Sequence, residues 1–374
     1  MAQRRNVILL ILFLGVCVAE AQHRASFDLT LDQKFESAEK TLELYEGLYG
    51  RPEGVAGLRG SKLALATTAL LARRPLSTQD LERSLEAVKF NQDLGDDVFR
   101  MREARANAGA IRELMDEVTR RSFAERVIRT VEQLFPPTAD VKSRVPVYFV
   151  AFGHHNIDAF VRRVVWRGDE PAFVGEGSGE LTIVMNLSKA VYYGRSVEER
   201  FVGVLSVVAH EVFHAAFGIY KDNSSRWRYY TANHRRHIDH LLALTQNEGI
   251  AYYLSLIHQT RGKLRPGWEE KIRSSFGTFS RNAEELLSPD ISPRRASEIV
   301  RESNTSGYWE SYGAMTGMII ARQIDQTLGR SALVETIAIG PNDFFRKYVD
   351  LMERDPTIPP LSPGIVQEIR RLRM

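Results

Sequence analysis

Apolar residues recur at helical spacing over residues 196–218 and predict a buried helix there. Ser196 and Glu199 have the spacing of a capping box, which predicts where the helix begins. Gly218 can adopt the left-handed conformation that ends a helix. The apolar positions that share one face are Val197, Phe201, Val204, Leu205, Val208, Val212 and Ala215.

The pattern along the rest of the chain predicts a mainly helical α+β fold. Helices are predicted over residues 31–48, 62–74, 77–90, 97–120, 122–135, 236–259, 308–328 and 341–352, with another beginning at Pro293. Two runs of β-branched and aromatic residues, 145–152 and 180–187, predict a small sheet directly before the central helix. The polar stretch 221–226 is typical of a surface loop.

The first 21 residues have the features of a secretory signal peptide. Arg4 and Arg5 precede an apolar run over 7–18, and residues 19–21 form a small-residue cleavage site. The apolar run would be about 18 Å long as a helix, too short for a stable membrane span of about 30 Å. Cys17 lies in a weak lipoprotein-like sequence, but Val16 is bulky for the position before the cysteine. We therefore expect cleavage after Ala21 and a secreted or periplasmic protein.

Composition narrows the chemistry available to the chain. The sequence has 374 residues, a formal net charge of +3 and a single cysteine. Removing Arg4, Arg5 and Glu20 with the signal peptide changes the charge by −1, to +2, which gives no reason to expect a nucleic-acid partner. Because the cysteine lies in the signal peptide, the mature chain has no disulfide, thiolate ligand or cysteine nucleophile. Composition leaves the oligomeric state open.

Three polar residues interrupt the apolar central helix and indicate a metal site. His210 and His214 are four residues apart, so their imidazoles project from the same side of the helix. Together with Glu211 they form the H-E-x-x-H pattern, in which the histidines bind zinc and the glutamate activates water. Burying these side chains without partners would cost on the order of several kcal/mol, whereas a bound Zn²⁺ would provide a partner for their polar atoms.

Zinc in a catalytic site usually has three protein ligands, so a third ligand is needed. Phe217 and Tyr220 exclude a continuation into a three-histidine motif. Glu248 lies in the next predicted helix among apolar residues, and we predict that it is the third ligand. Competing candidates are His234, His237 and His240, with Asp239, and His154-His155 after the first strand. His237 and His240 are about 16 and 12 Å along the helix from Glu248, too far to share one metal with it.

These residues resemble those of gluzincin metallopeptidases, which carry H-E-x-x-H on one helix and a ligand glutamate on a later one. Asn247 to Ala251 is similar to the sequence around that glutamate, and residues 308–317 resemble a segment of uncharacterised bacterial zinc-dependent proteases. The resemblance covers about 145–350. It implies a zincin-like domain over 138–374, preceded by a helical N-terminal region over 22–137. Thermolysin-like members have an aspartate four residues after the ligand glutamate, where this chain has Tyr252, so the groups that orient the ligands must differ.

The residues predict an exported zinc peptidase acting on peptides or proteins. Glu211 would accept a proton from the activated water and pass it to the leaving amine. Tyr312 and Tyr308, four apart, are candidates to stabilise the oxyanion, and Tyr312 is preferred because glycines nearby indicate tight packing. The strand at 181–187 is a candidate to pair with an extended peptide. The alternatives are a hydrolase of a non-protein amide, such as a cell-wall peptide, and an exported helical binding protein with a structural or inactive metal site.

Overall fold

The computed structural model describes residues 26–48, 50–156, 158–175, 179–305, 307 and 309–372. The expected signal peptide with Cys17 lies outside these residues, as does Tyr308. The strands are β1 (Phe27–Lys34), β2 (Val141–Val150), β3 (Ala159–Arg167), β4 (Glu170–Val174) and β5 (Glu180–Asn186). With the helices given below, they make up the mainly helical α+β fold that the pattern predicted.

Helices occupy most of the described chain. Those before the central helix are α1 (Glu36–Tyr45), α2 (Pro52–Ala56), α3 (Arg59–Ala72), α4 (Thr78–Lys89), α5 (Met101–Ala106), α6 (Ala108–Arg120), α7 (Phe123–Glu132) and α8 (Leu187–Ala190). The central helix and those after it are α9 (Val197–Asn223), α10 (Ser225–Asn233), α11 (His237–Thr260), α12 (Glu269–Leu287), α13 (Pro293–Glu302), α14 (Tyr312–Leu328), α15 (Arg330–Ile339), α16 (Pro341–Arg354) and α17 (Pro363–Arg371).

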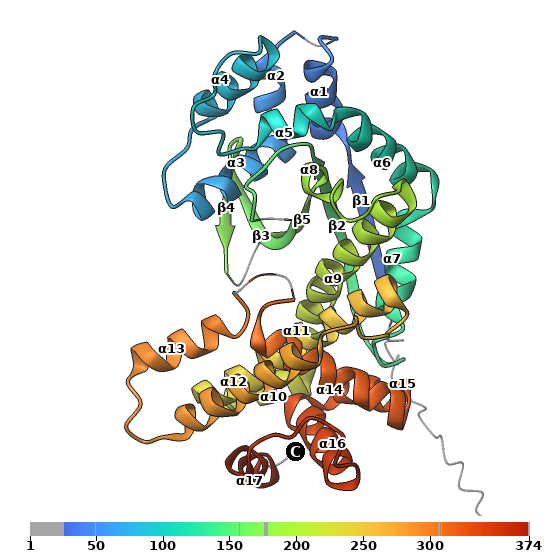
Figure 1. The fold of residues 1–374 in the computed structure, drawn as a ribbon, viewed down its shortest axis with the longest axis vertical. Coiled ribbons are helices and arrows are strands. Elements are labelled where there is room, and N and C mark those ends of the chain that lie inside the picture. Colours follow the sequence, from blue (N-terminus) through green and yellow to red (C-terminus); the bar gives the residue numbers. More distant parts are fainter. Residues whose placement is uncertain are drawn as a thin grey trace, which may run out of the picture.

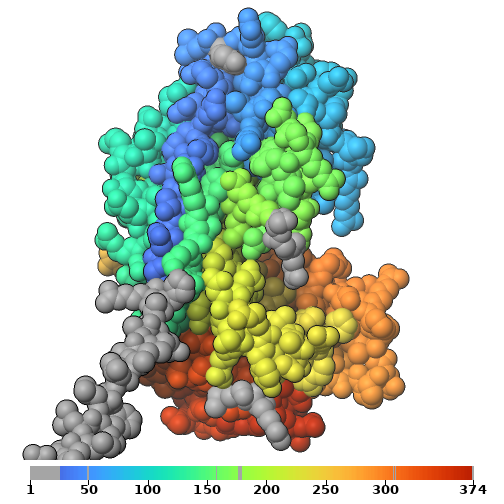
Figure 2. Space-filling view, turned by 180° about the vertical axis from the view of Figure 1, so that it is seen from behind, coloured from blue at the N-terminus to red at the C-terminus, as the bar shows by residue number. Residues whose placement is uncertain are grey.

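The five strands form one mixed sheet in the order β1-β2-β5-β3-β4. β1, β2 and β5 are parallel, and β3 runs antiparallel to both β5 and β4. The sheet and α1–α8 occupy one half of the molecule and α10–α17 the other, with α9 running between them (Figure 1). Seen from behind, the blue-to-green N-terminal half lies above the yellow-to-red C-terminal half (Figure 2). α9 therefore contacts both the sheet and the C-terminal helices.

The start of the central helix is as predicted, but its end is not. Ser196 accepts a hydrogen bond from the backbone N–H of Glu199, and the Glu199 carboxylate accepts from the backbone of Ser196, which completes the capping box. The helix continues past Gly218 to Asn223, and only Ser224 separates it from α10. The predicted loop at 221–226 is therefore wrong. A glycine inside a helix is tolerated where tertiary packing supports the flanking turns, as the buried Phe217 and Tyr220 do here.

α9 has the length and apolar composition of a membrane-spanning helix, and it is the one helix in the described chain that does. In its most apolar window, however, 72% of the residues are buried inside the protein. Its apolar character is that of a core helix packed between two halves of the molecule.

The first predicted helix was partly wrong, and one hairpin was missed. Residues 27–34 form a strand in which Leu29 and Leu31 are buried and alternate with polar residues. This strand pairs with β2, so the predicted N-terminal region shares a sheet with the region after it. The division at residue 137 stays a prediction. The β3–β4 hairpin turns at Gly168, which has a positive φ of 62°, and its alternation is masked by several arginines.

Two glycines let α11 and α14 touch through their backbones. A Cβ atom added to Gly249 would lie 2.2 Å from the carbonyl carbon of Gly317, and one added to Gly317 would lie 2.0 Å from the backbone oxygen of Thr245. Real Cβ atoms do not approach backbone this closely, so any larger residue would force the helices apart. This contact fixes the position of α11, the helix that carries Glu248.

We expect Gly317→Ala to destabilise the protein by about 3 kcal/mol, because neither backbone can move away without disturbing the core. Gly218→Ala is the matched control: it also lies within a helix, but its added Cβ meets nothing within 4 Å. This control should instead stabilise the protein by about 0.5–1 kcal/mol. Urea unfolding of the two variants measures the difference, and equal stability would contradict the close-contact account.

Candidate metal centre

Two helices bring the three predicted metal ligands together. α9 supplies His210 and His214, one turn apart, and α11 supplies Glu248 from across the interface between the helices. One ligand atom from each of the three lies within 4.8 Å of the others. The two Nε2 atoms are 3.0 Å apart, and Glu248 Oε2 lies 3.8 Å from Nε2 of His210 and 3.3 Å from Nε2 of His214.

These spacings match the donor set of a tetrahedral zinc site. With zinc–ligand distances of about 2.0–2.1 Å and tetrahedral angles, two ligand atoms lie about 3.4 Å apart. The three measured separations lie on both sides of this value. Two imidazoles and one carboxylate are also the donor types of a catalytic zinc site. Within the described residues the group has three members, which leaves a fourth position for water or substrate.

The electrostatics of the group favour a bound cation. Burial and the charge of His214 lower the pKa of His210 to about 3. Burial also lowers the pKa of His214, but the charge and hydrogen bond of Glu248 outweigh it and raise this pKa to about 9. Burial acts to raise the pKa of Glu248, yet His214 holds it below its usual value. The buried Glu248 carboxylate therefore favours a positive charge beside it, which a bound metal ion would supply.

Glu211 lies in the same cavity but outside the group of ligands. Burial raises the pKa of its carboxyl group to about 7. The charge of His214 and of Arg162 and a hydrogen bond from the backbone of Val161 act in the opposite direction. Both Val161 and Arg162 belong to β3, so this strand supplies a hydrogen bond and a positive charge to the Glu211 carboxyl group. A carboxyl group with a pKa near neutrality is suited to accept and return a proton.

Neighbouring groups orient each ligand. Nδ1 of His214 lies 3.2 Å from Oδ1 of Asn247, so a proton on Nδ1 would donate to this oxygen and leave Nε2 to ligate a metal ion. The backbone of Ala251 is a hydrogen-bond partner of His210, and Asn304 donates a side-chain hydrogen bond to Glu248. The ring of Tyr252 packs edge-on against His210 with centroids 5.2 Å apart. Aromatic packing thus stands where a thermolysin-like site would have an aspartate.

The ligands and Glu211 line a cavity of about 430 Å³. One wall is β3 with the residues just before it, the floor is α9 and α11, and the far side is the segment after α13, including Asn304 and Gly307. The sequence prediction missed Asn304 and Arg162. Neither belongs to a spacing pattern, and each reaches the cavity through packing of an element remote in sequence.

The structure does not bring Tyr312 to the metal centre. Its hydroxyl group donates a 2.8 Å hydrogen bond to the backbone oxygen of Ile299, and it does not line the cavity. Burial raises the pKa of this hydroxyl group to about 12. The predicted oxyanion role of Tyr312 therefore has no support in this geometry, because the side chain secures α14 to α13 instead. Tyr308, the other candidate, lies outside the described residues.

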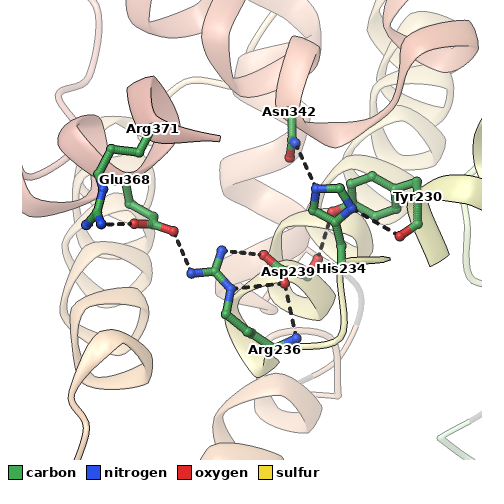
Figure 3. A network of polar contacts seen from close by, with 7 residues as sticks. All are labelled: Tyr230, His234, Arg236, Asp239, Asn342, Glu368 and Arg371. Atoms are coloured by element: carbon green, nitrogen blue, oxygen red, sulfur yellow. Dashed lines mark hydrogen bonds and ion pairs between the residues drawn. The ribbon is translucent and has the colours of Figure 1, made fainter. Parts of the chain in front are cut away.

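His234 and Asp239, two of the competing candidates, lie elsewhere and have structural partners (Figure 3). His234 stacks on Tyr230 with centroids 4.2 Å apart, and its Nε2 lies 3.5 Å from Nδ2 of Asn342 on α16. Asp239 pairs with Arg236 at 2.7 Å, and Arg236 also reaches Glu368 on α17 at 2.7 Å. This network joins the start of α11 to the C-terminal helices. Neither His234 nor Asp239 is a member of the metal group, and His237 and His240 are not members either.

The strand proposed to receive a peptide is in the interior of the sheet. β5 pairs with β2 on one side and with β3 on the other, so it has no free edge near the cavity. The prediction for 181–187 is therefore wrong, because β3, whose alternation is masked by arginines, pairs with this edge of β5. β4 pairs with β3 only from Arg163 to Arg167. Within the described chain, residues 159–162 of β3 thus have no strand on their outer side, and this segment lines the cavity.

Comparison with known proteins places the chain in a family. No curated protein and no solved structure matches it. A family profile does match, over residues 60–357, which is well over half of the chain and includes the metal centre and most of the N-terminal helices. The cofactor named by that family agrees with the His-His-Glu group described above. The chain belongs to the family described as "Putative zinc dependent peptidase (DUF5700)".

Proposed function

We propose that the protein is an exported zinc peptidase of the gluzincin type, with His210, His214 and Glu248 as metal ligands and Glu211 as general base. The observation that carries this proposal is the three-atom donor set at tetrahedral spacing, with the Glu211 carboxyl group in the same cavity. A structural zinc site usually has four protein ligands and needs no general base. The three-membered group with a fourth carboxyl group beside it supports the catalytic interpretation.

When bound, zinc supplies Lewis-acid activation of a water molecule and of the scissile carbonyl group. Glu211 accepts the proton of that water as the carbonyl carbon is attacked, and then gives the proton to the leaving amine as the C–N bond breaks. The buried surroundings that raise its pKa to about 7 suit both transfers. Asn247, Ala251 and Asn304 hold the ligand side chains in position throughout.

An extended peptide would pair with the outer edge of β3. Residues 159–162 of this strand line the cavity beside Glu211, and strand addition supplies backbone hydrogen bonds that do not depend on sequence. The backbone N–H of Val161 donates to Glu211 and its oxygen accepts from Nη1 of Arg162 at 3.0 Å, so both polar groups of this residue already have partners, which an incoming strand would replace. Such an edge favours a peptide or protein over a small non-peptide amide.

The test pairs metal analysis with an unbiased peptide library, using protein that begins at Gln22. We expect about one zinc ion per chain and cleavage products detected by mass spectrometry. Stoichiometric zinc without any cleavage would favour a binding protein. Turnover of cell-wall amides alone would show that the substrate is a non-protein amide.

Export is proposed from residues 1–21. N-terminal sequencing of the protein recovered from the extracytoplasmic fraction should begin at Gln22. A lipid-modified Cys17 at the N-terminus would instead make the protein membrane-anchored.

A further inference from the structure

A second cavity, of about 640 Å³, adjoins the metal cavity along α9. We call it the side cavity; its walls include Val202, Gly203 and Val207 of α9, Arg261 and Arg265 after α11, and Trp309. Val207 and Asp158 line both cavities. The two cavities are therefore neighbours along α9, with the metal ligands in one of them.

The distance between the side cavity and Glu211 suits a peptide. Gly203 lies eight residues before Glu211 on α9, about 12 Å along the helix. An extended peptide advances about 3.3 Å per residue, so three or four residues bridge the distance. A substrate whose scissile bond lies at Glu211 would thus place a side chain in the side cavity.

The wall between the cavities is held in a strained conformation. Trp309 has a φ of 65°, which is rare for a bulky residue and costs on the order of 1–3 kcal/mol. Its ring packs against Tyr252 of the metal cavity and against Trp268, with centroids 5.2 and 5.1 Å apart. Arg265 lies over both tryptophan rings, 5.4 Å from the centroid of Trp268 and 5.5 Å from that of Trp309. Strain of this kind persists where the surrounding packing maintains a functional shape.

The acidic residues of the side cavity have partners inside the protein. Glu198 pairs with Arg121, and the Glu199 carboxylate accepts hydrogen bonds from the backbone at the start of α9. The Tyr193 hydroxyl group is a hydrogen-bond partner of Asp158, and Lys189 contributes a nearby positive charge. These carboxylates are therefore already compensated.

Arg261 and Arg265, which also line the side cavity, differ from these carboxylates because they have no oppositely charged partner in the described chain. Within the described chain, neither Arg261 nor Arg265 forms an ion pair with an acidic side chain, although 28 ion pairs of other lysines and arginines are present. Arg265 donates instead to the neutral side chain of Gln259. Arg261 has a φ of 56°, as the residue that caps α11, which directs the chain around the rim of the cavity. Two guanidinium groups are thus available to a ligand at the same opening.

We propose that the side cavity is a specificity subsite that binds an acidic group of the peptide substrate, a Glu or Asp side chain or a C-terminal carboxylate, through Arg261 and Arg265. This proposal rests on the proposed function. A guanidinium group binds a carboxylate with charge-assisted and often paired hydrogen bonds, which a neutral amide of the same shape cannot replace.

The first experiment uses hexapeptide libraries that are identical except for Glu or Gln at one position, scanned along the peptide. The wild type should prefer Glu at one position by about tenfold or more in kcat/KM, the effect of one charged hydrogen bond. In Arg261→Gln/Arg265→Gln, turnover of the Glu library should fall to that of the Gln library, which itself should be nearly unchanged. Arg294→Gln is the matched control, since Arg294 is an exposed arginine on α13, outside both cavities. A free C-terminal carboxylate is distinguished by repeating the assay with amidated peptides.

A binding experiment makes the test independent of turnover. Zinc-loaded Glu211→Gln should bind the Glu library about tenfold more tightly than the Gln library, and the two arginine substitutions should abolish the difference. Equal affinities, or equal losses for both libraries, would overturn the subsite. If the wild type binds with this preference but cleaves nothing, the subsite stands and the peptidase proposal fails. If it cleaves without any acidic preference, the peptidase proposal stands and the subsite fails.

Discussion

Glu211→Gln should hydrolyse peptides at least about a hundredfold more slowly than the wild type while keeping its zinc, the low end of what a positioned acid–base group contributes. Glutamine has the shape and hydrogen-bonding reach of glutamate but cannot accept the proton of the attacking water. Because Glu211 is outside the three-membered metal group, its loss as a base should leave metal binding intact. Steady-state kinetics on a cleaved library peptide, with zinc measured in the same preparation, gives both quantities.

Glu270→Gln is the matched control for this substitution. Glu270 lies in the first turn of α12, outside both cavities, and its side chain is largely exposed and paired with Arg273. It should retain nearly full activity. Loss of zinc in Glu211→Gln would make Glu211 a structural residue, and full activity with zinc bound would show that another group is the base.

Replacing any of the three ligands should remove the zinc and, with it, all measurable hydrolysis. His210→Ala, His214→Ala and Glu248→Ala each leave two donors, too few to hold zinc in this site against solvent. The wild type should contain about one zinc ion per chain. Elemental analysis after exhaustive dialysis measures the metal, and thermal unfolding checks that each variant remains folded.

His240→Ala should keep its zinc, because His240 lies at the start of α11 outside the metal group. Zinc at wild-type stoichiometry in Glu248→Ala would assign the third ligand to another residue. Both residues lie on α11. If zinc is lost in Glu248→Ala and kept in His240→Ala, the loss comes from the missing ligand and not from a general disturbance of this helix.

Much of the metal centre follows from local sequence. A four-residue spacing on one helix fixes the relative direction of two side chains, so His210 and His214 could be paired without knowledge of the fold. The capping box of Ser196 and Glu199 likewise depends on residues three apart. The prediction of Glu248 rested on less local evidence, namely its apolar surroundings and the resemblance to gluzincins. The structure brings its carboxylate next to both imidazoles.

Other features depended on contacts between distant segments. Tyr312 had the right residue type and a glycine-rich context, but packing of α14 against α13 directs its hydroxyl group to Ile299. The peptide-pairing edge moved from β5 to β3 because sheet order is set by strands that pair across the chain, not by the sequence of any one strand. Asn304 reaches Glu248 only because α13 and the segment after it fold back over α11.

By itself, then, the sequence determined the elements whose periodicity and caps are local: the central helix, its histidines and its glutamate, and the mainly helical α+β class. Only the tertiary structure decided which strand has a free edge, which residues orient the ligands, and that Arg261 and Arg265 line a cavity next to that of the metal centre. The physical reason is range. Helical spacing acts within one or two turns, whereas cavities, sheet order and ion-pair partners arise from packing between segments far apart in the chain.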